Sequence, residues 1–310
     1  MAATFLGIEI GGTKLQLVSG DDAGRIHHRR RLSVQPLEGG AGIRRQIESA
    51  LPELLSPGTP AAIGVGFGGP VDWRTGAICC SHQVEGWSNF NLGEWLGKMS
   101  GVPVFIDNDA NVAALGEARH GAGEGFDSVF YVTLGSGVGA GLVVRGEIFH
   151  GAKPGESEIG HVRLDREGTL VEQRCSGWAV DKSIRELVSR NPNSVLNKLI
   201  GEKIGGEARF LSEALRQGDM LAGEILRDTA THLAFGLSHV VHLMHPEVIV
   251  LGGGLSLIGE PLRSAIAEVL PQFIMEAFHP GPEIRLAALG EDSVTVGALT
   301  LARERLATRR

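Results

Sequence analysis

The chain has 310 residues, 43% of them hydrophobic, and its 29 basic and 36 acidic residues give a formal net charge of −7. This length and hydrophobic content suffice for a substantial buried core, in one large domain or two smaller ones. The charge argues against nucleic-acid binding, because affinity for a phosphate backbone needs clustered Lys and Arg. The longest basic run, residues 27–31, is better explained as a solvated strand or turn.

The cysteine pattern and the absence of long apolar runs indicate the compartment. Cys79, Cys80 and Cys175 form a poor disulfide framework, because their number is odd and two are adjacent. This favours a reducing compartment. No apolar run reaches membrane-spanning length without a Gly or a charge, and the first residues lack a basic segment. We therefore expect a cytoplasmic protein without a membrane segment.

The first half of the chain predicts a β-meander followed by alternating strands and helices. Strands are expected at residues 4–10, 13–19 and 25–34, with a turn at residues 20–22. Apolar spacing then predicts a helix at 41–55, a strand at 61–67, a helix at 92–100, a strand at 102–106 and a helix at 110–120.

The second half restarts this pattern. A strand at 127–134, a glycine-rich turn at 135–141 and a strand at 142–148 echo residues 4–19, which indicates a weak internal duplication. A mostly helical region from about 176 to 245 includes a long amphipathic helix at 219–244. A strand at 248–251, a helix at 255–278, a strand at 283–289 and a helix at 293–307 follow. Strands alternating with helices twice over predict an α/β architecture of two similar lobes, and a crevice between such lobes is a natural ligand site.

Three glycine-rich turns are candidates for contact with a phosphate or a nucleotide. Gly11 and Gly12, beside the Thr13 hydroxyl, could form an anion nest, although a tight hairpin turn explains them equally well. Alternate glycines at 135–141 leave one face of bare backbone for a ligand; no helix follows, so the context of a dinucleotide-binding turn is missing. Residues 252–254 end a strand before a helix, where a plain turn would need only one Gly.

A cluster of carboxylates and amides follows the strand expected at 102–106. Asp107, Asn108, Asp109 and Asn111 stand before a helix, and a helix cap would need only one of them. A carboxylate at the mouth of a cleft can take a hydroxyl proton, while neighbouring amides hold sugar hydroxyls. This pattern favours a catalytic site.

Glu158, His161 and Glu172 form a second polar group. Carboxylates and an imidazole accept and donate hydrogen bonds together, as a polyol ligand requires. A solvated loop and a zinc site are the alternatives. Cys175 is the only nearby thiol and the chain has no C-x-x-C pair, which argues against zinc.

Together these motifs resemble the ROK family of sugar kinases and related repressors. The resemblance spans nearly the whole chain and is carried by GIEIGGTK (7–14), GFGGPVD (66–72), DNDANVAALGEARHG (107–121), VTLGSGVGAGLVVRGEIFHG (132–151), GESEIGH (155–161) and HPEVIVLGGGLS (245–256). It implies the actin-like ATPase (ribonuclease H-like) fold, with two α/β lobes around a central cleft. The small lobe would hold residues 1–107 and 291–310, and the large lobe residues 108–290, with the ATP site and a homodimer surface. The helix at 219–244 is a candidate for that surface, and burial inside the lobe explains its pattern equally well.

The resemblance also implies roles for particular residues. Asp109 would be the catalytic base. The sugar would contact Gly68, Gly69, Asn108, Glu158, His161 and Glu172. The phosphates of ATP, with Mg²⁺, would face Gly11, Gly12, Thr13 and Lys14 and also Gly135, Ser136 and Gly137, and adenosine would lie beside Gly252, Gly253 and Gly254.

Two departures from the family pattern alter these expectations. Many relatives have Asp where this chain has Glu9, which would meet Mg²⁺ indirectly, through its water shell. The family's zinc motif, C-x-C-G-x-x-G-C-x-E, is absent, and residues 166–177 keep only its final Glu, as Glu172. We therefore expect no structural zinc and a less rigid sugar loop.

The expected activity is transfer of phosphate from ATP to a hexose hydroxyl, with O6 of glucose or a related hexose as acceptor. A sugar-responsive regulatory or binding protein without turnover is the alternative. The first strand, expected from about residue 4, leaves no room for the helix-turn-helix of the family's repressors, and the Asn108–Asp109 pair argues against a silent module. The identity of the sugar, and polyphosphate in place of ATP, stay open. Trp87 is expected to be packing.

Overall fold

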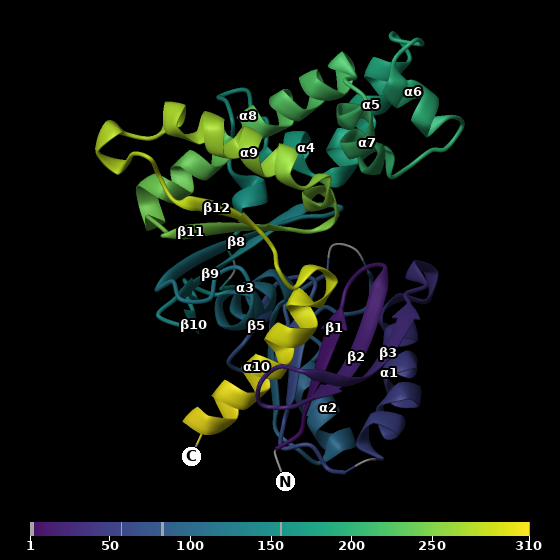
Figure 1. Cartoon of the computed structure of the whole chain (residues 1–310). Helices are drawn as coiled ribbons and strands as arrows, with labels where there is room; N and C mark the ends of the chain where they lie inside the picture. The colour runs from purple at the N-terminus through teal and green to yellow at the C-terminus, as the bar shows by residue number, and fades with distance from the viewer. Residues whose placement is uncertain (1–2, 57, 82–83, 156, 310) are drawn as a thin grey trace. The chain divides into compact units, whose positions relative to one another are not determined.

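The computed structural model describes residues 3–56, 58–81, 84–155 and 157–309. The chain divides into two compact units (Figure 1). Unit 1 comprises Met1–Asp127, Gly141–Ser157 and Glu291–Arg310, and unit 2 comprises Ser128–Ala140 and Glu158–Gly290. The C-terminal segment thus packs with the N-terminal part of the chain. The expected lobe boundary after residue 107 does not coincide with a unit boundary, because residues 108–127 and 141–157 also pack in unit 1.

The sheet of unit 1 has the strand order β3-β2-β1-β4-β7, and its strands are β1 (Phe5–Ile10), β2 (Lys14–Gly20), β3 (Ile26–Ser33), β4 (Ile63–Phe67) and β7 (Val104–Asn108). The first three strands form an antiparallel meander, while β4 and β7 run parallel to β1. A small ribbon of β5 (Val71–Asp72) and β6 (Ala77–Ile78) lies apart from this sheet. The meander and the α/β character predicted from the sequence are confirmed.

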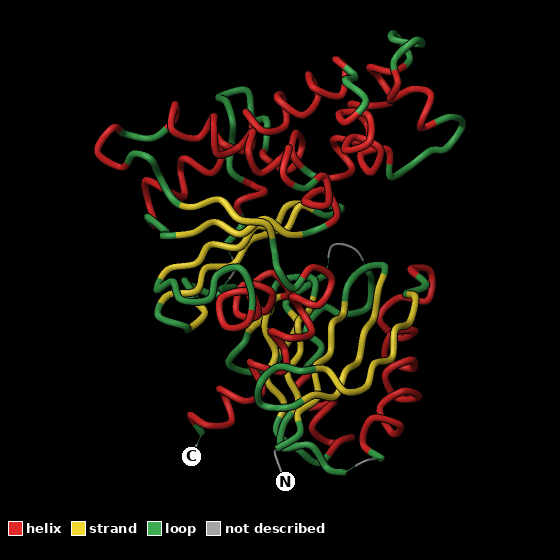
Figure 2. The backbone as a smooth tube through the Cα atoms, in the orientation of Figure 1, coloured by secondary structure: helices red, strands yellow, loops and turns green. Residues whose placement is uncertain are grey.

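Helices cover both faces of this sheet, and they are α1 (Gly39–Leu55), α2 (Leu92–Ser100), α3 (Asp109–His120) and α10 (Ser293–Thr308) (Figure 2). Because side chains alternate along a strand, Leu6, Ile8 and Ile10 share one buried cluster with residues of α1 and α2. The opposite face meets α10. A Cβ on Gly64 would lie 1.9 Å from the Ala298 carbonyl oxygen, so glycine permits this close approach of helix to sheet.

The second sheet has the order β10-β9-β8-β11-β12, and its strands are β8 (Ser128–Leu134), β9 (Val138–Val144), β10 (Glu147–Ile148), β11 (Val248–Gly252) and β12 (Glu283–Leu286). The boundary between the two units falls within β9. Strands β8, β11 and β12 are parallel, and every residue of β11 is buried. Continuous burial explains why β11 is apolar throughout instead of alternating.

The helices of unit 2 are α4 (Val171–Cys175), α5 (Gly177–Val188), α6 (Val195–Ile200), α7 (Leu211–Arg216), α8 (Met220–Met244) and α9 (Glu260–Val269). Helix α8 packs against α9 and α4, and much of it is buried within the unit. Its exposed large apolar side chains are Met220, Leu243 and Met244, at its two ends. Packing inside the unit therefore accounts for most of the helix's amphipathic pattern.

Two predicted elements differ from the structure. Strand β9 begins at Val138, so the glycine-rich turn is shorter than residues 135–141. Gly141 lies inside the strand because α3 crosses it closely: a Cβ there would be 2.7 Å from the Ala110 carbonyl oxygen. The helix expected at 255–278 is broken into 3₁₀ turns around α9, since Gly259 has a positive φ of 81° and a new turn begins at Leu270, with Pro271 in its first positions.

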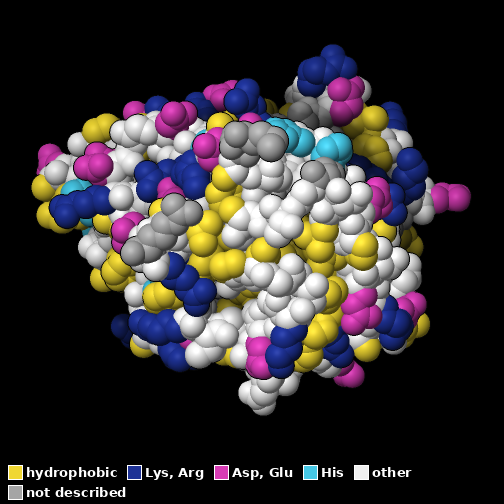
Figure 3. Space-filling model, turned by 90° about the horizontal axis from the view of Figure 1, so that it is seen from below, with side chains coloured by type: hydrophobic (Ala, Val, Ile, Leu, Met, Phe, Trp, Pro, Cys, Tyr) yellow, Lys and Arg dark blue, Asp and Glu magenta, His cyan; other side chains and the backbone are white. Residues whose placement is uncertain are grey.

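None of the described helices is both long and apolar enough to cross a membrane. Seen from below, basic and acidic side chains are interspersed with apolar ones, and no continuous basic face is visible in that view (Figure 3).

Candidate active site

The β1–β2 hairpin of unit 1 carries the first glycine turn. The Gly11 N–H donates to the Lys14 carbonyl oxygen at 2.9 Å, which closes the turn around Gly12 and Thr13. A Cβ on Gly11 would lie 3.3 Å from that same oxygen, so the turn is tight. The structure thus supports a hairpin-turn requirement for Gly11, one of the two interpretations open from the sequence.

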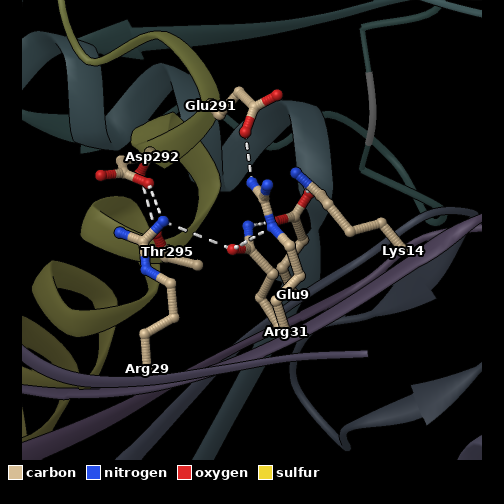
Figure 4. Close-up of polar contacts among 8 residues, drawn as sticks. Glu9, Lys14, Arg29, Arg31, Glu291, Asp292 and Thr295 are labelled. Atoms are coloured by element: carbon tan, nitrogen blue, oxygen red, sulfur yellow. Dashed lines mark hydrogen bonds and ion pairs between the residues drawn. The ribbon is translucent and has the colours of Figure 1, made fainter. Parts of the chain in front are cut away.

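Glu9 and Lys14 form an ion pair at the base of this turn (Figure 4). The Lys14 Nζ lies 2.9 Å from one carboxylate oxygen of Glu9, and Gln16 Nε2 donates to the other at 2.7 Å. The Glu9 side chain is only 11% exposed. Lys14, which is expected near phosphate, and Glu9, which is expected near Mg²⁺, are therefore direct neighbours.

A polar network behind Glu9 fixes its orientation (Figure 4). The fully buried Gln16 accepts a hydrogen bond from Arg31 Nε at 3.2 Å, and Arg31 pairs with Glu291. Arg29 lies 2.8 Å from Asp292, and this hydrogen-bonded pairing raises the pKa of Arg29 above its ordinary value. Two arginines of the basic run, Arg29 and Arg31, thus pair with acids that directly precede α10.

Asn108 and Asp109 stand where β7 passes into α3. Asn108 caps the helix, since its Oδ1 accepts from the N–H of Ala110 at 2.9 Å and of Asn111 at 3.3 Å. Its Nδ2 donates to the Gly69 carbonyl oxygen at 3.3 Å. The amide therefore caps a helix and also ties the 68–69 backbone to the start of α3.

The half-buried Asp109 lies next to Gly68. Its Oδ1 accepts from the Ala110 N–H at 2.9 Å, and a Cβ on Gly68 would lie 3.4 Å from its Oδ2. The Gly68 N–H in turn donates to the Ile10 carbonyl oxygen at 2.8 Å, directly before Gly11. One glycine thus joins the carboxylate to the strand that leads into the first turn.

A buried pair that sequence reasoning missed supports this junction. Asp107 Oδ2 lies 2.7 Å from His150 Nε2, and the two side chains are 3% and 7% exposed. Asp107 Oδ1 accepts from the Asn108 N–H and from Asn111 Nδ2, both at 2.9 Å. The His150 ring stacks on Trp73 at 4.3 Å. Asp107 stood in a segment noted for its carboxylates, whereas nothing in the sequence marked His150 as its partner.

In unit 2, Glu172 binds the second glycine turn. Its Oε2 accepts from the Val138 N–H at 2.9 Å, and a Cβ on Gly137 would lie 2.4 Å from that oxygen. The Gly135 carbonyl oxygen accepts from the Gly177 N–H at 2.7 Å. Ser136, between Gly135 and Gly137 in sequence, is half-buried. The structure therefore groups Glu172 with the turn at 135–137, whereas the resemblance had grouped it with the sugar contacts.

Glu158 and His161 lie at the ends of a short 3₁₀ turn that packs against α4. The Glu158 carboxylate is 3.6 Å from His161 Nδ1, and the two side chains are 52% and 69% exposed. They are therefore accessible to a ligand on the surface of unit 2.

The three glycines that follow β11 serve different purposes. A Cβ on Gly252 would lie 2.1 Å from the Tyr131 hydroxyl, and Gly253 has a φ of 81° and abuts the Leu134 backbone. Both are required by packing and by backbone conformation. A Cβ on Gly254 would meet nothing within 4 Å, so the fold itself does not require glycine there.

The segment that replaces the family's zinc motif forms a compact hairpin. The Leu164 N–H donates to the Thr169 carbonyl oxygen at 2.7 Å, and Asp165 Oδ1 accepts from the N–H of Gly168 and Thr169 at 2.8 and 2.9 Å. These hydrogen bonds, chiefly those with Thr169, lower the pKa of Asp165. The backbone and one carboxylate thus hold the segment closed.

Cys175, the thiol nearest to this hairpin in sequence, is fully buried. Its Sγ lies 3.8 Å from the Thr229 carbonyl oxygen, and burial raises the pKa of the thiol to about 12. Among the described residues, no group of three His, Cys, Asp or Glu side chains is placed to hold a metal ion.

The ROK family model matches residues 5–305. A glucokinase of Halalkalibacterium halodurans is 32% identical to the chain, over 94% of this chain and 93% of the relative. The crystal structure of a ROK family glucokinase from Streptomyces griseus, in complex with glucose and AMPPNP, superposes with a TM-score of 0.85 at 30% identity, covering 97% of this chain and 100% of that one. A putative xylose repressor of Caldicellulosiruptor sp. is 25% identical over 90% of this chain and 73% of its own length. The chain therefore belongs to the ROK family, with the actin-like ATPase fold of its sugar kinases.

Proposed function

We propose that the chain transfers phosphate from ATP to a hydroxyl of a hexose, with Asp109 as the general base. The observation that carries this proposal is the proximity of Asp109 and Gly11 to Gly68: a Cβ on Gly68 would lie 3.4 Å from Asp109 Oδ2 and 3.6 Å from Gly11 Cα, and the Gly68 N–H donates to the strand that ends in the Gly11 turn. A proton acceptor and a turn suited to phosphate are thus neighbours in one unit. The glucokinase relatives support the same activity.

Asp109 has the environment of an ionised base. It is the first residue of α3, and its Oδ1 accepts from the Ala110 N–H. The N-terminus of a helix favours the carboxylate over the carboxylic acid. Asp109 would accept the proton of the attacking hydroxyl, which raises the nucleophilicity of that oxygen as it meets the γ-phosphate.

The sugar contacts are proposed residue by residue. In unit 1, Asn108 and the backbone of Gly68 and Gly69 would hold hydroxyls; the Asn108 amide is already fixed by its cap and by the Gly69 carbonyl oxygen. In unit 2, Glu158 and His161 are exposed and adjacent, as polyol recognition requires. Glu172 remains a proposed contact that would act while bound to the Val138 N–H.

The nucleotide contacts follow the glycine turns. The Gly12 N–H, the Thr13 hydroxyl and the Lys14 ammonium group would face phosphate oxygens in unit 1, in a turn that the Gly11 N–H closes by donating to the Lys14 carbonyl oxygen. Gly135, Ser136 and Gly137 would do so in unit 2, and Gly252, Gly253 and Gly254 would lie beside adenosine. Gly135 and Gly254 support this best, because the fold has no steric need for glycine at either position.

The Glu9 carboxylate suits an indirect role toward Mg²⁺. Mg²⁺ prefers oxygen ligands and usually keeps several waters beside one or two carboxylates and the substrate phosphates. Glu9 offers carboxylate oxygens held in place by Gln16 and Lys14, so it would hold water of the metal's shell. Mg²⁺, when bound, neutralises charge that builds up on the phosphates.

The test compares Asp109→Asn with Asp22→Asn, a substitution of an exposed Asp in the same unit, by coupled measurement of ADP release over a panel of sugars. We expect Asp109→Asn to bind glucose normally and to lose about 10²–10⁴-fold in kcat, the usual contribution of a general base. Near-normal turnover in Asp109→Asn would remove the assigned role. The same panel, run with ATP and with polyphosphate, identifies the sugar and the donor.

A regulatory protein without turnover is the second candidate, favoured by the similarity to a putative xylose repressor. It predicts sugar binding with no ADP release by the wild-type chain, and a shift of genomic DNA fragments in a gel. We expect ADP release and no shift. We also propose that the protein is cytoplasmic and that it forms a homodimer. Light scattering on the purified chain would test the homodimer.

A further inference from the structure

A cavity of about 650 Å³ lies within unit 1, along the outer side of β7. Strand β7 is the edge strand of its sheet, and Val104 to Asp107 form the inner wall. The 73–76 turn, α2 and the C-terminal part of α10 complete the lining. Among the described residues that line it, none is a proposed catalytic, sugar or nucleotide contact. This volume is typical of sites for small molecules.

Three arginines converge on this cavity, Arg74 from the 73–76 turn and Arg305 and Arg309 from the C-terminal end of α10. Arg74 and Arg305 place their guanidinium carbons 4.5 and 4.6 Å from the ring centroid of Trp73, and Arg309 lies 5.3 Å from that of Phe105. All five side chains line the cavity. A guanidinium over a ring uses its flat face for the cation–π contact, and its N–H groups, which lie in the plane, stay available as donors.

Those donors are not used within the part of the chain that the structure describes. No hydrogen bond or ion pair there involves the side-chain N–H groups of Arg74, Arg305 or Arg309, unlike those of Arg29 and Arg31. Arginine forks of this kind match the oxygens of phosphate and carboxylate.

The carboxylates of the same lining are already paired. Glu94 lies 2.6 Å from Lys98 Nζ, and the buried Asp107 lies 2.7 Å from His150. Neither neutralises the three guanidinium groups. The lining therefore carries unbalanced positive charge beside the apolar surface of residues such as Phe105 and Leu301.

We propose that this cavity binds a small phosphorylated metabolite, with its phosphate on Arg74, Arg305 and Arg309 and its remaining atoms against the apolar wall. Three guanidinium groups suit a phosphate dianion, and the apolar wall suits a sugar or nucleoside body. The site adjoins the catalytic junction through one chain of contacts: Trp73 stacks on His150, which holds Asp107, which binds the Asn108 N–H.

The test is calorimetric titration of the full chain with three probes: inorganic phosphate, glucose 6-phosphate and AMP. We expect at least one probe to bind, and the strongest of the three identifies phosphate alone, a sugar phosphate or a nucleotide as the ligand class. Arg74→Ala and Arg305→Ala should each weaken that binding about tenfold or more, the loss expected for a hydrogen bond to a charged group. The matched control is Arg45→Ala, an exposed arginine of the same unit whose partner is Glu38.

Two results overturn the proposal: no binding of any probe, or equal binding by wild type, Arg74→Ala and Arg305→Ala. The second result would also assign any observed binding to another site. If Arg305→Ala melts early, Arg305→Lys and the exposed Arg74 carry the comparison. Calorimetry registers binding with or without turnover, so this outcome is independent of the kinase proposal.

Discussion

Alanine at Gly135 and at Gly137 should separate a glycine kept for a ligand from one kept for the fold. A Cβ at Gly137 would lie 2.4 Å from Glu172 Oε2 and 3.2 Å from its Cδ, so the carboxylate would have to move. A Cβ at Gly135 would meet nothing within 4 Å of protein. The two substitutions add the same methyl group to one turn, with different expected consequences.

The magnitudes follow from these contacts. Moving Glu172 breaks its hydrogen bond with the Val138 N–H, and a hydrogen bond to a charged group contributes about 1.5–3 kcal/mol. For a unit of this size, that loss should lower the Tm by roughly 3–10 °C in Gly137→Ala. Gly135→Ala should leave the Tm unchanged or raise it slightly, because alanine lowers the entropy of the unfolded chain. Its methyl group should nonetheless raise the KM for ATP about tenfold, by holding the phosphates off the backbone.

Thermal unfolding by circular dichroism and ADP release at varied ATP concentration measure the two effects. Gly223→Ala, in α8 and outside every motif, is the control for the added methyl group, since its Cβ would meet only Arg227 at 3.6 Å. Wild-type KM for ATP in Gly135→Ala would refute the assignment of this turn to the nucleotide. An unchanged Tm in Gly137→Ala would show instead that the Glu172 carboxylate can move away without a loss of stability.

Three further predictions concern single side chains. The pKa of His120 lies below its ordinary value of 6.5, chiefly because burial disfavours the charged ring. The unfolded chain thus binds the proton more readily, and the free energy of unfolding should fall as the pH drops below about 6.5. The fall should be smaller in His120→Gln, as melting curves at several pH values would show. Cys175, whose burial raises its pKa to about 12, should resist alkylation at pH 8 while the exposed Cys79 reacts, and labelling of Cys175 in the folded chain would contradict this expectation. Elemental analysis should find no zinc, and one zinc per chain would contradict that expectation. Glu9→Gln should raise the Mg²⁺ concentration for half-maximal ADP release about tenfold, and an unchanged Mg²⁺ titration would exclude a role near the metal.

The sequence predicted the layered architecture well, because local patterns control it. The meander of β1 to β3, the helix at 92–100 and the long α8 each carry a regular apolar period with turn residues or caps at their ends. The failures lie where tertiary contact overrides local preference. Gly141 belongs to a strand because α3 passes over it, and nothing in the local sequence carries that information.

Parts of the candidate site were predictable for a different reason. Asn108 and Asp109 follow a buried strand, and polar residues at that position face the end of a sheet. His150 could not be assigned to Asp107 in the same way, since 43 residues separate them and the loop between β10 and the 3₁₀ turn has no periodic pattern. Its pairing depends on where the loop returns over β7, which only the folded backbone determines.

The glycines show how far a motif can be read before the structure is known. Gly252, Gly253 and Gly254 form one motif in the sequence, yet the Tyr131 hydroxyl requires the first and a φ of 81° requires the second. Only Gly254 has no such requirement. Gly137 and Gly135 divide in the same way. Neither a close protein atom nor a positive φ explains glycine at Gly135 and Gly254. On this ground these two glycines are better candidate markers of the nucleotide than the glycine-rich runs that contain them.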